Sequence, residues 1–239
     1  MFSAARRLVT ISAFVAAAGL NASAEDLTIV SVVKMGQNEA TSTQYLTPTR
    51  SRHSAADNDT ITEFATGRIV GINHKKKEYY ETSLAEMEAS FRQMAAELEK
   101  MPAFVRKTMG ADVRPITVQK GTATRKIAGY DCSQYTLSMG DALVFDLWVT
   151  TALAYPARYV DTLSTPYAAM GPAGRRFEAM FGEVKKIKGV SLAMGMSYKL
   201  VGKKVDTLTE ATEVRRGPIP ESAFAIPAGY KKTKSPLAR

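Results

Sequence analysis

Short segments in which apolar and polar residues alternate fill most of this 239-residue chain. Because successive side chains of a β-strand point to opposite faces, each such segment predicts a strand with one apolar face. Turn residues separate neighbouring segments, so hairpins can join them and the sheet should be antiparallel. The predicted strands cover residues 26–35, 41–46, 50–54, 60–65, 68–74, 78–82, 116–119, 122–127, 131–139, 142–150, 191–200 and 205–215.

The period changes after residue 82, where Ser83 and Glu86 have the spacing of a helix capping box. Apolar residues then recur at steps of three and four, which predicts an amphipathic helix that ends or kinks at Pro102. A short second helix could follow over residues 102–110, one helical turn could open at Pro166, and an amphipathic helix is predicted over residues 177–184. The stripe of the long helix consists of Leu84, Met87, Phe91, Met94, Leu98 and Met101.

These elements predict an α+β fold. A large antiparallel sheet with one apolar face needs a cover, and two or three amphipathic helices are available for it. We therefore expect a curved antiparallel sheet, an open half-barrel, with two or three amphipathic helices covering its concave face. Such a shape often leaves an apolar cavity between helices and sheet. No linker divides the sequence, so residues 25–239 should form a single domain.

The first 24 residues have the three parts of a secretory signal peptide. Arg6 and Arg7 precede an uncharged apolar run over residues 8–20, and small residues lead to Ala24. The run is shorter than the roughly 20 residues needed to cross a bilayer. We expect cleavage near Ala24 and a periplasmic or secreted protein without a lipid anchor.

The formal net charge of +9 is compatible with anionic partners such as nucleic acid or lipid head groups. The lysines are spread over apparent turns and the C-terminal end, which favours solvated turns, with attraction to an anionic membrane surface as the alternative. Export and the lack of a recognition motif argue against nucleic acid as a partner. The single cysteine, Cys132, cannot form an internal disulfide, and its alternating surroundings predict a small buried side chain.

Motifs that carry catalytic chemistry are missing from the sequence. His53 and His74 lack the spacing of a zinc site, and neither a phosphate-binding glycine loop nor a nucleophile elbow occurs. Residues 57–59 begin like a calcium loop but lack its glycine and closing glutamate, so a hairpin turn is the better interpretation. We expect a protein that is not an enzyme and needs no cofactor or metal.

Methionine is the informative excess, with 11 residues. Ordinary core packing is the simplest interpretation of these methionines. Their flexible thioethers would also suit the wall of an adaptable apolar cavity. A Cu(I) site is a third alternative, because thioethers bind Cu(I). The leading hypothesis is a hydrophobic small molecule or lipid held between helices and sheet; a packed structural or interaction protein of the cell envelope is the alternative. The candidate cavity residues are Leu84, Met87, Phe91, Met94, Leu98, Met101, Phe177, Leu192, Met194, Met196 and Tyr198.

Three segments resemble a known superfamily. Residues 57–64 with 77–80 resemble the Asp-rich turn and hairpin of the periplasmic lipoprotein carriers, LolA-like and LolB-like, and residues 224–230 resemble their C-terminal ending. Residues 129–132 together with the Phe-x-Ile-Pro-x-Gly-Tyr ending resemble an uncharacterised family of exported bacterial proteins near that superfamily. The resemblance implies a curved sheet around a helical lid. The carriers begin with a helix, whereas the first predicted strand of this chain begins near Leu27. No functional residue of the carriers matches a position of this chain.

The signal-peptide interpretation predicts the start of the mature protein. We expect the chain recovered from the periplasm of an expressing bacterium to begin at Glu25, because signal peptidase cuts after small residues such as Ala24. N-terminal sequencing and intact mass check this. An Ala22→Tyr, Ala24→Tyr variant should accumulate uncleaved. Recovery of wild type with Met1 intact in the cytoplasm would contradict the interpretation.

Overall fold

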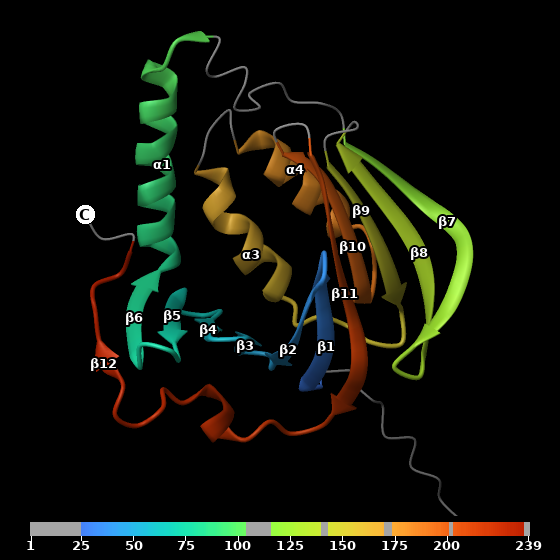
Figure 1. Cartoon of the computed structure of the whole chain (residues 1–239), viewed down its shortest axis with the longest axis horizontal. Coiled ribbons are helices and arrows are strands. Elements are labelled where there is room, and N and C mark those ends of the chain that lie inside the picture. Colours follow the sequence, from blue (N-terminus) through green and yellow to red (C-terminus); the bar gives the residue numbers. More distant parts are fainter. Residues whose placement is uncertain (1–24, 104–115, 140–142, 170–173, 201–202, 237–239) are drawn as a thin grey trace, which may run out of the picture.

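The computed structural model describes residues 25–103, 116–139, 143–169, 174–200 and 203–236. Within these residues, twelve strands form one open, curved sheet in the order β12-β6-β5-β4-β3-β2-β1-β11-β10-β9-β8-β7 (Figure 1). Every neighbouring pair is antiparallel except β12 and β6, so the predicted large curved antiparallel sheet is confirmed. The strands are β1 (Leu27–Met35), β2 (Asn38–Leu46), β3 (Arg50–Ala55), β4 (Asn58–Glu63), β5 (Arg68–Asn73), β6 (Glu78–Ser83), β7 (Ile116–Ile127), β8 (Tyr130–Met139), β9 (Leu143–Thr150), β10 (Val190–Leu200), β11 (Lys203–Arg216) and β12 (Lys231–Lys232).

The sheet consists of two meanders joined in its middle. Strands β1 to β6 follow one another in chain order toward one edge, and β11 back to β7 follow toward the other edge. The pairing of β1 with β11, from Leu27 opposite Arg216 to Met35 opposite Thr207, holds the two meanders together. The predicted break between two strands in residues 116–127 is a bulge inside the single strand β7.

The long helix α1 (Leu84–Lys100) begins with the predicted capping box. The Glu86 N–H donates to Ser83 Oγ at 3.2 Å, and the Ser83 N–H donates to the Glu86 carboxylate at 3.1 Å. None of its residues is buried, and Met94 and Met101 at its far end are exposed. A stack of Phe91 on Tyr167 of α3, with ring centroids 5.8 Å apart, joins α1 to the rest of the molecule.

Two further helices, α3 (Tyr159–Ala168) and α4 (Arg175–Val184), lie between α1 and strands β9 to β11 (Figure 1). The helix predicted over residues 177–184 is confirmed as the main part of α4. Pro166 lies inside α3 instead of opening it, because the preceding turn is already anchored in the core by Tyr159. Most of the short helix predicted over residues 102–110 lies outside the described residues.

Helices and C-terminal segment pack on opposite faces of the sheet. On one face, Met180 and Val184 of α4 pack against Leu137 and Leu147, and a cluster containing Tyr155 and Tyr159 includes Leu27, Ile29 and Leu46. On the other face, residues 219–230, which include the short 3₁₀ helix η2 (Glu221–Phe224), cover Ile61, Val70 and Ile72. Cys132 is buried as predicted.

Burial predicts a large difference in stability between the centre of the sheet and α1. Leu46 is fully buried, so Leu46→Ala should cost about 3–5 kcal/mol through the cavity that it leaves. Met94→Ala on the exposed end of α1 should cost less than about 0.5 kcal/mol. Urea unfolding of both variants measures this, and equal losses would contradict the loose attachment of α1.

Candidate functional site: the helix-side face of the sheet

The helix-side face is the face of the sheet that carries Leu27 and Leu46 beside α3, and Leu137 and Leu147 beside α4. Directly paired residues of an antiparallel ladder point to the same side, so the strand register follows this face from strand to strand. One such row crosses six strands from β1 to β7 and is apolar except for one threonine. It consists of Met35, Thr207, Met196, Phe145, Leu137 and Val118.

Helix α4 covers only part of this row. Leu137 is buried beneath the helix and Phe145 is packed against the same cluster. At the other end Met35 is exposed, and Met194, which lies on the same face beside Leu147, keeps 37% of its surface exposed. Met196 and Tyr198 are half-buried. The helix-side face therefore carries an apolar row that α4 covers over β8 and β9, with exposed methionines on β10 and at the end of β1.

On β2 to β6 the same face is mostly polar, with Leu46 and Ile69 as buried apolar exceptions. Toward the other end of β1, the row of Ile29 leads to the paired residues Gln44, His53, Thr60, Gly71 and Tyr80. The Gln44 side chain donates a hydrogen bond to the Tyr159 hydroxyl of α3, which places this row on the helix side. A Cβ at Gly71 would lie 2.3 Å from the Tyr80 ring, so only glycine leaves room for that ring over the sheet.

His53 of β3 lies in the polar part of this face. Its side chain is exposed, yet the surrounding protein lowers its pKa by desolvation, against an opposing effect of Asp59. The helix-side face thus changes from apolar at β9 and β10 to polar at β3 and β4.

The structure divides the eleven predicted cavity residues into two groups. Along α1, Leu84, Met87, Phe91 and Leu98 are half-buried, while Met94 and Met101 are exposed. Phe177 and Phe91 both contact Tyr167, so the aromatic cluster joins all three helices.

The second group lies on β10. Met194, Met196 and Tyr198 share the helix-side face, as their alternation predicted. A register shift between Ser191 and Ala193 takes Leu192 out of the ladder, and Leu192 is buried in the core. Sequence alternation could not show this bulge, because its local pattern is unbroken.

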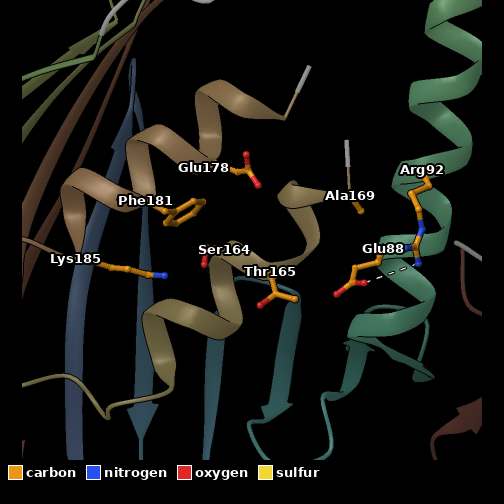
Figure 2. Close-up of a pocket in the computed structure, with 9 residues that line it drawn as sticks. Glu88, Arg92, Ser164, Thr165, Ala169, Glu178, Phe181 and Lys185 are labelled. Carbon is orange, nitrogen blue, oxygen red and sulfur yellow. Dashed lines mark ion pairs between the residues drawn. The ribbon is translucent and has the colours of Figure 1, made fainter. Parts of the chain in front are cut away.

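A polar cleft of about 540 Å³ separates the three helices (Figure 2). Glu88 and Arg92 of α1 face Thr165 of α3 and Glu178 of α4 across it. Arg92 pairs with Glu88 at 3.8 Å, and Lys185 pairs with Asp161 at 2.6 Å. The cleft shows that α1 does not form a sealed layer with α3 and α4.

A second cleft of about 540 Å³ lies between the sheet and the helices. Its wall includes Leu147 and Val149 of β9, Tyr155 and Val160 around the start of α3, and Val184 of α4. Burial raises the pKa of Tyr155 to about 12, which keeps its hydroxyl neutral at physiological pH. Leu147 is the ladder partner of Met194, so this apolar cleft adjoins the exposed methionine surface.

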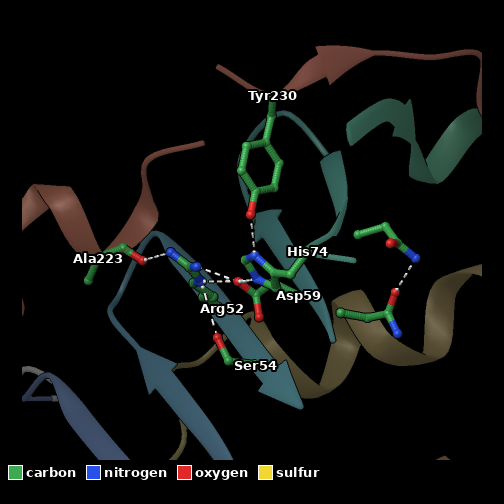
Figure 3. Close-up of polar contacts among 8 residues, drawn as sticks. Arg52, Ser54, Asp59, His74, Ala223 and Tyr230 are labelled. Atoms are coloured by element: carbon green, nitrogen blue, oxygen red, sulfur yellow. Dashed lines mark hydrogen bonds and ion pairs between the residues drawn. The ribbon is translucent and has the colours of Figure 1, made fainter. Parts of the chain in front are cut away.

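Sequence reasoning missed a polar network on the opposite face (Figure 3). Asp59, only 4% exposed, accepts hydrogen bonds from Arg52 Nε at 3.1 Å and from His74 Nε2 at 2.8 Å. Arg52 also donates to the Ala223 carbonyl at 2.6 Å, and His74 Nδ1 lies 2.9 Å from the Tyr230 hydroxyl. The network fastens the C-terminal segment to the sheet, and the pairing of these distant residues leaves no local signal in the sequence.

The electrostatics of Asp59 follow from these partners. Burial alone raises the pKa of its carboxyl, but hydrogen bonds from Arg52, His74 and Ser54 and the charge of Arg52 outweigh it. The net effect holds the Asp59 pKa below its usual value. The carboxylate is therefore ionised and paired at neutral pH, and its role in the network is structural.

The described residues contain neither a group of His, Cys, Asp and Glu side chains suited to a metal ion nor a helix suited to crossing a membrane. Among those residues, no three His, Cys, Asp or Glu side chains gather as a group that could hold a metal ion. None of the helices in the same residues is both long and apolar enough to cross a bilayer. The predicted Cu(I) alternative concerns methionines and stays a prediction.

The protein is an α+β protein with one large, open antiparallel sheet and helices packed on one side of it. The chain belongs to the family described as "Domain of unknown function (DUF4412)", whose model matches residues 49–230. This confirms the predicted membership of a family without an assigned activity. No curated protein matches the chain.

Solved structures match the chain at low sequence identity. An uncharacterized conserved protein from Thermus thermophilus is 7% identical, with a TM-score of 0.49 over 89% of this chain and 91% of that chain. The Pseudomonas aeruginosa MucA/MucB complex matches at 9% identity and a TM-score of 0.41 over 84% of this chain and 55% of that chain. A LolA superfamily protein from Nitrosomonas europaea matches at 8% identity and a TM-score of 0.29, over 84% and 90%.

The Asp59 network predicts an acid-sensitive contribution to stability. Because the folded-state pKa of Asp59 is depressed, its contribution is present above the unfolded value near 4 and is lost as pH falls through the folded value. Asp59→Asn should cost about 3 kcal/mol at pH 7, since it leaves the half-buried Arg52 without its counter-charge. Urea unfolding at pH 7 and pH 3 tests this. A gap between wild type and variant that stays constant down to pH 3 would overturn the assignment.

Proposed function

We propose that this protein is a non-enzymatic, exported binder of an amphiphile with an acyl chain, held on the helix-side face of the sheet. The observation that carries the proposal is the apolar row from Met35 to Val118, which α4 covers at one end and leaves open at the other. Soluble proteins rarely keep a contiguous apolar surface without a use for it. In this proposal the sheet is a half-barrel and the three helices cover its concave side.

Two features support an amphiphile over a purely apolar ligand. The apolar cleft beside Leu147 has a volume within the range of small-molecule sites and adjoins the methionines of β10. The polar row with Gln44, His53 and Thr60 continues the same face and offers hydrogen bonds to a head group. The acyl chain would lie along β9 and β10, and the head group would lie toward β3 and β4.

The methionines explain how one surface can accept chains of different length. Met194 and Met196 have flexible, polarizable side chains that rearrange at low cost. The loosely attached helix α1, which has no buried residue, could move away to admit the ligand. In this proposal, residues 25–239 form a single domain. The protein is cleaved near Ala24 and delivered to the periplasm or beyond.

The test uses a polar replacement of equal length. Met194→Gln with Met196→Gln should weaken binding of a fluorescent fatty acid at least tenfold, because an amide would be buried against the chain without a partner. Leu208→Gln is the matched control: Leu208 is 39% exposed, close to the 37% of Met194, and points to the opposite face of β11. The control should bind like wild type. Native mass spectrometry of protein purified from the periplasm should show a co-purifying lipid.

Two outcomes would overturn the proposal. One is a wild-type protein with a clean apo mass and no saturable uptake of the fluorescent fatty acid, which would favour a packed structural protein of the envelope. The other is an equal loss of binding in the Leu208→Gln control.

A further inference from the structure

Two lysine clusters that lie far apart in the sequence meet at one corner of the molecule. The first, Lys75, Lys76 and Lys77, forms the turn between β5 and β6. The second, Lys231, Lys232 and Lys234, lies on and after β12. All six side chains are exposed. We call these six residues the basic corner, which Figure 1 places at the outer edge of the sheet near β6 and β12.

Backbone hydrogen bonds fix this arrangement. The Lys231 N–H donates to the Lys77 carbonyl at 3.0 Å, and the Thr233 N–H donates to the Tyr79 carbonyl at 2.8 Å. These bonds add β12 to β6 as a short parallel strand, with Lys231 opposite Glu78. The C-terminal segment that leads into β12 is itself held by Tyr230 and Phe224, so the two clusters keep their relative position.

The corner carries more positive charge than its neighbours neutralise. Lys75 pairs with Asp57 at 2.6 Å, and Lys232 pairs with Glu81. The other four, Lys76, Lys77, Lys231 and Lys234, form no ion pair with the part of the chain that the structure describes. Edge lysines also keep sheets from pairing with each other, but Lys75, Lys76 and Lys77 lie in the turn between β5 and β6 and not on the edge strand.

We propose that the basic corner is a docking surface for an anionic lipid membrane. All six cations are lysines, whose hydrated point charges suit diffuse attraction to a charged surface, whereas specific phosphate recognition favours the planar fork of arginine. The six lysines lie on and after the edge strand β12 and in the neighbouring turn, where a flat membrane surface can approach their exposed side chains. The proposal rests on the proposed function for its purpose, since a lipid binder must meet a membrane to exchange its ligand.

The experiment compares two variants with the same change in net charge. Lys76→Gln, Lys231→Gln and Lys234→Gln remove three charges from the corner and leave Lys77, which has a φ of +52°, in place. The control, Lys120→Gln, Lys126→Gln and Lys186→Gln, removes three exposed lysines from β7 and the end of α4. Each corner lysine should contribute about fivefold to the apparent affinity for the membrane. Co-sedimentation of the full chain with vesicles of equal parts phosphatidylglycerol and phosphatidylcholine measures it.

The expected result is binding of wild type and control to the anionic vesicles, at least tenfold weaker binding of the corner variant, and loss of binding for all at 1 M salt. Equal binding of the two variants, or no binding of wild type to anionic vesicles, would overturn the proposal. Tighter binding to duplex DNA than to vesicles would overturn the choice of a lipid surface. The vesicle result is independent of fatty-acid uptake by Met194→Gln with Met196→Gln, so failure here and failure of the proposed function are distinguishable.

Discussion

The pairing of β1 with β11 is the interaction on which the rest of the structure depends. It brings the first strand of the chain beside one of the last and joins two meanders that otherwise share no ladder. Its register sets the helix-side face, because it aligns Ile29 with Val214 and Met35 with Thr207. A slip by one residue would turn every side chain of one meander to the wrong face. The β1–β11 alignment therefore extends the row of β7 to β11 to Met35 and places Leu27 and Ile29 on the same face.

The two faces of the sheet are closed by different means. The outer face of β2 to β6 is covered by the C-terminal segment, which apolar contacts and the Asp59 network hold in place. The helix-side face is covered only in part, by helices that leave a polar cleft between α1 and α4. One covered face and one partly covered face suit a binding protein, because the ligand can enter and leave at the helix-side face while the C-terminal segment stays on the other face.

Local patterns in the sequence were sufficient for most of the architecture. Alternation located the strands, and the Ser83–Glu86 box and the stripe from Leu84 predicted α1, because strand period and helix capping are properties of neighbouring residues. The stripe did not show how firmly α1 is held, since burial depends on elements far away in the chain. The bulge at Leu192, the helical turn before Pro166 and the network of Arg52, Asp59 and His74 likewise arise from tertiary contacts. Of the candidate site, the face shared by Met194 and Met196 was predictable, whereas its continuation into Phe145 and Met35 required the strand register.

The central claim is that an acyl chain lies on the helix-side face beside Met196 and Phe145. A crystal structure of the protein with a fatty acid brominated along its chain tests it most directly, because bromine positions appear in anomalous density regardless of how the ligand is built. The account predicts bromine peaks between β9, β10 and the helices. Peaks confined to the face that carries Leu208, or a helix-side face closed by packed side chains in the presence of saturating ligand, would contradict it.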